Sequence, residues 1–147
     1  MIRTLLFAAA TAGCLGLAGA ASAQGDCLAY GPSPVALTGM VSSLQASGPP
    51  GYGKTPETDA VVQVPILQMT PPACVAADTA DPARVALQDV NTIQLVFQPQ
   101  GPRFRAEMTG TSFMVAGTLV PPAGPQHITP VVLVVDRMEQ VLAPAAD

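Results

Sequence analysis

This sequence is poor in charged and aromatic residues. Only 11% of its 147 residues are charged and 4% are aromatic, and the formal net charge is −4. Binding to a phosphate backbone relies on clustered Lys and Arg, and binding to single strands relies on stacked aromatic side chains. The composition therefore argues against nucleic acid as a partner.

The chain also lacks the short motifs that carry familiar chemistry. It has neither G-x-S-x-G nor H-E-x-x-H, and no glycine-rich phosphate loop follows a strand and opens a helix. Of its three cysteines, Cys14 lies in the N-terminal segment, residues 1–23. The single histidine, His127, and the other two thiols, Cys27 and Cys74, are too few ligands for a typical zinc site. We expect no catalytic residues, no metal and no cofactor, and we favour a noncatalytic protein.

Residues 1–23 have the pattern of a cleaved signal peptide. Arg3 gives the positive start, residues 5–17 are apolar, and Ala21-Ser22-Ala23 is a small-x-small cleavage site. The apolar run is shorter than the roughly 20 residues that a membrane span needs. Export to the periplasm or the exterior is the prediction, with no membrane span after cleavage. An uncleaved anchor and a lipoprotein attached through Cys14 are the alternatives, although Thr11 stands where a lipid-attachment box usually has leucine.

Residues 24–147 are predicted to form one domain. Removal of the first 23 of the 147 residues leaves 124, a typical single-domain length, and changes the net charge from −4 to −5 through loss of Arg3. A chain of this size buries roughly two-thirds of its unfolded surface and can hold a core.

A disulfide between Cys27 and Cys74 is expected in an exported chain. Cys27 precedes the first predicted strand and Cys74 follows the second, and in an antiparallel hairpin those two ends lie side by side. The bridge would close a loop of about 48 residues and contribute roughly 4 kcal/mol on the chain-entropy model.

Sixteen prolines divide the chain into strand-like segments. Alternating or β-branched apolar residues predict strands at 35–42, 61–69, 90–97, 113–120 and 131–135. The last is apolar on both faces and should be covered on both. Gly39 predicts a bulge or a barrel bend in the first strand, and Gly117 predicts a bend in the fourth. Pro65 predicts that part of the second strand lies at an edge or in a bulge.

The segments between these strands have their own signals. Residues 45–59 form a long Gly/Pro loop, and residues 71–89 a connection with a helical turn near 81–87, in which Asp81 would be the N-cap. Residues 101–109 are a short link with one helical turn ending at Gly110.

Five strands, an internal glycine in the first and an interruption after the third predict an all-β, OB-like barrel with at most one short helix. A β-sandwich of about seven strands is the alternative, which the strand count decides.

Several short patterns, taken together, resemble a family of short exported bacterial proteins known only as a domain of unknown function. They run in this order: Tyr30-x-Pro32-x-x-x-Leu37-x-Gly39, Gly48-Pro49-Pro50-x-Tyr52, Pro72-x-Cys74-Val75, Ile93-Gln94-Leu95, Val115-x-Gly117-x-Leu119 and His127-x-Thr129-Pro130-Val131-x-Leu133. The family usually has two adjacent histidines where this chain has Gln126-His127, and an aromatic residue where it has Pro65. The resemblance implies the barrel and no particular activity.

The predicted ligand-binding residues are His127, Thr129, Tyr52, Lys54 and Glu57. In an OB-type barrel the loops between strands one and two and between strands four and five flank the usual ligand face. Here these two Gly/Pro-rich loops carry the only histidine, the only lysine and one of two tyrosines. The alternative is that His127 is an ordinary exposed loop residue.

Three functions remain open from the sequence. The one we favour is a noncatalytic binding or accessory domain of the cell envelope, whose partner is an envelope protein or a small ligand. A small hydrolase that uses His127, with Ser112 and Asp136 as the remaining candidates, is the second. A structural envelope protein without a ligand is the third.

Overall fold

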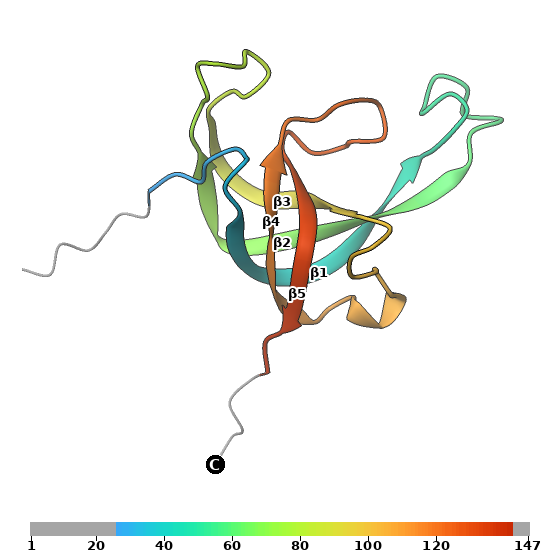
Figure 1. Cartoon of the computed structure of the whole chain (residues 1–147). Helices are drawn as coiled ribbons and strands as arrows, with labels where there is room; N and C mark the ends of the chain where they lie inside the picture. The colour runs from blue at the N-terminus through green and yellow to red at the C-terminus, as the bar shows by residue number, and fades with distance from the viewer. Residues whose placement is uncertain (1–25, 143–147) are drawn as a thin grey trace, which may run out of the picture.

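The computed structural model describes residues 26–142, which form one small β-barrel (Figure 1). The predicted signal peptide and Cys14 lie outside the described residues. None of the helical segments within residues 26–142 has the length and hydropathy of a membrane-spanning helix.

Five strands close the barrel in the order β1-β2-β3-β5-β4. β3 and β5 run parallel, and the other neighbours run antiparallel. This confirms the OB-like barrel and excludes the sandwich for the described residues. The strands are β1 (Val35–Ser47), β2 (Val61–Val75), β3 (Leu87–Phe97), β4 (Ser112–Val120) and β5 (Val132–Gln140).

The interior is filled by alternate residues of every strand, as the period of two requires. These residues are aliphatic, with Phe113 and Tyr30 the only buried aromatic side chains in the part of the chain described. β5 is covered on both faces at its start, as predicted, because Val131, Val132 and Leu133 are all fully buried. The central members of the core are Leu37, Val41, Leu67, Ile93, Leu95, Val115, Leu119, Leu133 and Val135.

Two glycines allow the strands to bend, as predicted. A Cβ on Gly39 would collide with the carbonyl of Gln68, and one on Gly117 with the carbonyl of Val134. At Gly117 the register with β5 shifts, which marks a β-bulge opposite it. No register shift accompanies Gly39, so there the prediction of a bend holds and that of a bulge does not.

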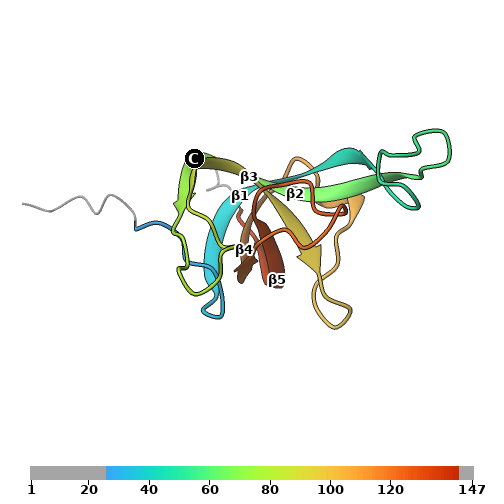
Figure 2. The ribbon, with the colours of Figure 1, turned by 90° about the horizontal axis from the view of Figure 1, so that it is seen from above.

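The first two strands are longer than predicted, and the distal part of their hairpin leaves the barrel. β1 pairs with β4 up to Met40 and with β2 from Met40 onward. β2 pairs with β3 only from Ile66. Residues 43–47 and 61–65 therefore form a two-stranded arm that projects from the barrel (Figure 2). Pro65 lies in this arm, which confirms its prediction as an edge residue.

β2 continues to Val75, so the predicted connection over residues 71–89 is wrong at both ends. Two prolines, Pro71 and Pro72, lie inside the strand. They are tolerated because the pairing of β2 with β1 has ended at Gln68, and the register with β3 is interrupted between Gln68 and Ala73. Their missing N–H groups break no ladder hydrogen bond.

The disulfide between Cys27 and Cys74 is confirmed, with a Cα–Cα distance of 4.7 Å. The reason for its position differs from the prediction, since Leu28 forms a parallel bridge with Val75 rather than an antiparallel hairpin. The Leu28 N–H donates to the Cys74 carbonyl (2.8 Å), and the Ala76 N–H donates to the Leu28 carbonyl (2.8 Å). The N-terminal segment is thus held beside the end of β2.

The helical turn predicted near residues 81–87 is not a helix. Asp81 does begin a turn, because its carbonyl accepts the Arg84 N–H (2.9 Å). The side chain of Arg84 then donates to the Gly31 carbonyl and the Asp78 carboxylate, both at 2.8 Å. These tertiary contacts replace the helical continuation, and β3 begins at Leu87.

The helical turn predicted before Gly110 is confirmed as the 3-10 helix η1 (Ala106–Met108). Gly110 follows it with a φ of 81°, a conformation that glycine adopts without strain.

Candidate functional site

The projecting arm of β1 and β2 has one apolar and one polar face. Leu44 pairs with Val64 and Ala46 with Val62, and these four side chains share one face. The opposite face carries Ser43, Gln45, Gln63 and Pro65. The apolar face is continuous with the outer surface of the barrel and not with its interior.

The β4–β5 loop, residues 121–131, is tied to β3 through one residue, Gln94. The Gln94 side chain accepts the Ile128 N–H at Oε1 (2.8 Å) and donates from Nε2 to the Gln126 carbonyl (3.1 Å). The Gln94 N–H donates to Thr129 Oγ1 (3.0 Å), whose hydroxyl donates to the Val131 carbonyl (2.6 Å). We call this set of contacts the Gln94 latch.

The latch holds the loop across the outer face of the sheet. Ile66 pairs with Gln94 and lies outside the interior cluster, yet its side chain is fully buried. The loop is thus bound to Gln94, the cross-strand neighbour of this buried apolar side chain. Gln94 is itself buried, with every polar atom of its side chain hydrogen-bonded, as burial demands.

A groove of about 240 Å³ lies between the arm and the latched loop. We call it the hairpin groove. Its walls come from the apolar face of the arm on one side and from the loop on the other, and no charged side chain lines it. The residues that define it are Ala46, Tyr52, Val62, Val64, Gln126 and Ile128.

The β1–β2 loop, residues 48–60, is held by Asp59. Its carboxylate accepts the N–H groups of Gly51 and Gly53, both at 2.6 Å, and the Thr55 hydroxyl at 2.7 Å. Desolvation raises the pKa of the Asp59 carboxyl, but the hydrogen bonds from Thr55, Gly53 and Gly51 outweigh it and lower the pKa below its usual value. This loop places Tyr52, with a φ of 50°, at the rim of the groove.

The structure brings only some of the predicted ligand-binding residues together. Tyr52 lines the hairpin groove, whereas Lys54 and Glu57 are exposed on the β1–β2 loop away from its walls. His127 is half-buried in the β4–β5 loop, and its Nδ1 accepts the Ala123 N–H (2.8 Å). Thr129 is buried, and its hydroxyl serves the Gln94 latch. A direct ligand contact by any of these five residues stays a prediction.

Gln94 and Ile128 are the important residues that the sequence reasoning missed. The alternation of the strand places Gln94 on the face opposite Ile93 and Leu95 and assigns it no further role. The available signal was an amide in the middle of the apolar run Ile93-Gln94-Leu95-Val96. A buried amide must find partners, but the sequence does not say that those partners are in the β4–β5 loop.

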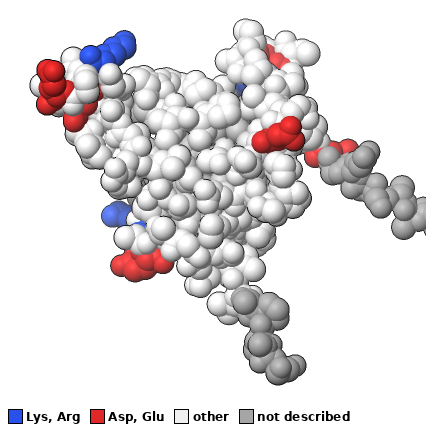
Figure 3. Space-filling model, turned by 180° about the vertical axis from the view of Figure 1, so that it is seen from behind, with Lys and Arg blue, Asp and Glu red and all other residues white. Residues whose placement is uncertain are grey.

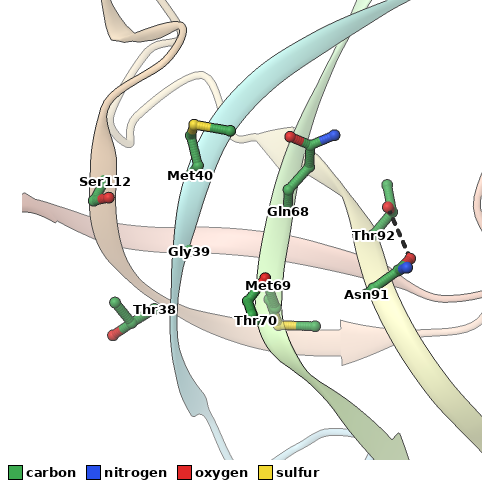
Figure 4. Close-up of a pocket in the computed structure, with 9 residues that line it drawn as sticks. All are labelled: Thr38, Gly39, Met40, Gln68, Met69, Thr70, Asn91, Thr92 and Ser112. Atoms are coloured by element: carbon green, nitrogen blue, oxygen red, sulfur yellow. Dashed lines mark hydrogen bonds between the residues drawn. The ribbon is translucent and has the colours of Figure 1, made fainter.

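A second and larger hollow, of about 490 Å³, lies on the same outer face at the barrel end of β1 and β2 (Figure 4). We call it the sheet hollow. One cross-strand row of four residues, Ser112, Met40, Gln68 and Thr92, runs across its floor. Thr92 donates to the neighbouring Asn91 side chain (3.1 Å). Because the strands beneath this row are paired, a ligand here would meet side chains and little free backbone.

The outer face of these strands carries almost no charge. β1 and β2 contain no Asp, Glu, Lys or Arg. The space-filling view from behind shows a broad uncharged area with the charged groups near its margins (Figure 3). The face therefore favours uncharged ligands, since burying an unpaired charge against it would be costly.

The residues considered for hydrolysis are not assembled. Ser112 begins β4 and His127 lies in the loop that follows β4, and among the described residues no hydrogen bond joins the two. Asp136 accepts instead from the Gln98 side chain (3.3 Å). Within residues 26–142, no three His, Cys, Asp or Glu side chains are grouped for metal binding.

Comparison with protein-family models, with curated proteins and with solved structures finds no match to this chain. The resemblance to a family of exported bacterial proteins therefore stays a prediction.

Proposed function

We propose that this protein is a noncatalytic binding domain of the bacterial cell envelope, with its ligand in the hairpin groove. The ligand is uncharged and apolar where it enters the groove. The signal-like start of the chain supports export, and the disulfide is compatible with an oxidising compartment.

The observation that carries the proposal is the groove itself. It is concave and mostly apolar, with a tyrosine at its rim and two amides, Gln94 and Gln126, beside it. Sites of this composition are typical of ligand binding, because apolar area supplies affinity and a few polar groups supply orientation. Its loop wall is held by the latch before any ligand arrives, which lowers the entropy lost on binding.

The two alternatives have less support. A hydrolase needs a nucleophile hydrogen-bonded to its histidine, and among the described residues the His127 Nδ1 accepts from the Ala123 N–H and not from Ser112. A purely structural protein does not account for an arm whose apolar face is left beside an open groove.

The proposal is tested by cross-linked capture of partners, proteins and small molecules alike, by the mature protein in its native envelope. Ile128 and Val141 are matched exposed side chains, at 41% and 42% exposure, but only Ile128 lines the groove. We expect Ile128→Asp and Tyr52→Ala to lose the captured ligand, and Val141→Asp to retain it. A ligand retained by Ile128→Asp and Tyr52→Ala would overturn the groove as the site.

A further inference from the structure

The projecting arm leaves one edge of β2 without a neighbouring strand. In the arm, the Gly48 N–H donates to the Ala60 carbonyl across the hairpin (2.6 Å). Backbone groups of successive residues point to opposite edges of a strand, so Val62 and Val64 also face β1. The backbone groups of Val61, Gln63 and Pro65 consequently face the other way.

That edge lies beyond the end of the β2–β3 ladder, which begins at Ile66. Among the described residues, no backbone hydrogen bond from a loop reaches Val61 or Gln63 on this side. Val61 and Gln63 thus each present an N–H and a carbonyl to solvent. Pro65 presents a carbonyl alone and marks where strand addition must stop.

The free edge has little protection against a further strand. Natural sheets usually guard exposed edges with charged side chains, proline or a covering segment. Here the arm strands carry no charge, and Pro65 at the inner end is the one guard on this edge. The opposite edge is equally uncharged, but only Ser47 at its loop end lines the hairpin groove, and Ser43 and Gln45 do not. On the β2 edge both Gln63 and Pro65 line it.

We infer that the ligand of the hairpin groove is an uncharged, extended peptide segment that adds as a strand to the free edge of β2. Its backbone pairs with Val61 and Gln63, and one of its alternate apolar side chains enters the groove against Val64 and Ile128. The inference rests on the proposed function and names its ligand class.

Three features of the site favour a peptide over other occupants. The unpaired N–H and carbonyl groups alternate along the edge at the spacing of a peptide backbone, which a sugar or a lipid does not reproduce. The uncharged strands favour an uncharged segment. The β4–β5 loop bounds the groove opposite the arm, so the space between them suits one added strand better than the two-stranded arm of a second copy.

The test uses a displayed library of random nine-residue peptides selected on the mature protein. Gln63 and Gln45 face each other across the hairpin, with their backbone groups on opposite edges. Gln63→Pro removes the N–H at the β2 edge, Gln45→Pro is the matched control at the β1 edge, and Gln63→Ala removes the side chain alone. We expect Gln63→Pro to weaken binding of a selected peptide about tenfold or more relative to Gln63→Ala, which keeps the backbone N–H, and Gln45→Pro to leave binding unchanged.

A second measurement protects the test if a proline variant fails to fold. N-methylation of the selected peptide, one residue at a time, should abolish binding at alternate positions only. Peptides whose binding falls in Ile128→Asp but not in Gln63→Pro would overturn strand addition and leave the groove as the site. A captured non-peptide ligand lost in Ile128→Asp would do the same.

Two further outcomes are informative. Self-association in sedimentation that Gln63→Pro abolishes would assign the edge to a second copy and overturn the peptide. Absence of any peptide in the selection, together with absence of any captured ligand, would overturn both proposals.

Discussion

The two halves of the β1–β2 hairpin have similar sequences and different surroundings. In residues 35–42 and 66–75 the outer edges are occupied by β4 and β3, and the alternate side chains fill the barrel. In residues 43–47 and 61–65 the alternation continues, but no strand pairs with either edge. The same alternating pattern stabilises the barrel where other strands enclose it, and leaves an apolar face open to solvent where they do not.

The largest expected effect is on the free energy of unfolding, because side chains in the core are buried and those in the arm are exposed. Leu133 of β5 is fully buried in the core, against which the barrel half of the hairpin packs, whereas Leu44 in the arm is 42% exposed. We expect Leu133→Ala to lower the free energy of unfolding by about 3–4 kcal/mol, and Leu44→Ala by less than about 1 kcal/mol. Urea titrations of both variants measure this, and equal losses would show that the arm is part of the cooperative core.

Removal of the disulfide should act on the barrel half alone. We expect Cys27→Ala with Cys74→Ala to lower the free energy of unfolding by about 3 kcal/mol, because the unfolded chain loses the constraint of a cross-link spanning 47 residues. The bridge lies at the barrel end of β2, away from the arm. Peptide affinity at the hairpin groove should therefore be unchanged at a temperature where the variant is folded. A lower affinity would show that the groove depends on the disulfide end of the barrel.

The Gln94 latch ties the β4–β5 loop, one wall of the hairpin groove, to β3 of the barrel, so breaking it should affect both stability and the groove. Gln94→Leu leaves the Ile128 N–H and the Gln126 carbonyl without partners, and we expect a loss of about 2 kcal/mol. The Ile128 amide should exchange with solvent faster, and ligand affinity should fall. Hydrogen exchange followed by NMR measures the first effect. Unchanged exchange at Ile128 would refute the latch.

The smallest effect concerns acid and the β1–β2 loop. The pKa of Asp59 is lowered in the folded protein, so its hydrogen bonds are complete above the unfolded value, near 4, and are lost as the pH falls through the folded value. We expect the Gly51 and Gly53 amide signals to move below about pH 4 while the barrel signals stay constant. Asp59→Asn should remove the transition, and its persistence there would assign it to another group.

Much of the barrel was predictable because its signals are local. The alternation in residues 113–120 and the β-branched run after Pro130 define β4 and the start of β5. Gly39 and Gly117 were correctly assigned to bends. The helical turn near Asp81 was wrong because the Arg84 side chain has tertiary partners that no local pattern records.

The candidate site was less predictable. Tyr52, a predicted ligand-binding residue, lines a groove that both the β1–β2 and the β4–β5 loops border, and its contact with a ligand stays a prediction. The latch was missed, because its partners Gln94 and Ile128 are 34 residues apart in the sequence. Thr129 was chosen as a ligand contact, and its hydroxyl is satisfied by the protein itself.

From the sequence alone follow the approximate positions of the five strands, their apolar faces and the cysteines that can pair, but not the full extent of the strands. These properties follow from side-chain period, β-branching and the small number of thiols. Only the tertiary structure decided where β1 exchanges β4 for β2, where β3 leaves β2, and how the latched loop lies against the arm. The physical reason is that a period of two specifies the faces of a strand but not its neighbours. The sequence of a strand with a paired edge therefore has the same pattern as that of a strand with an unpaired edge, and only the folded barrel distinguishes them.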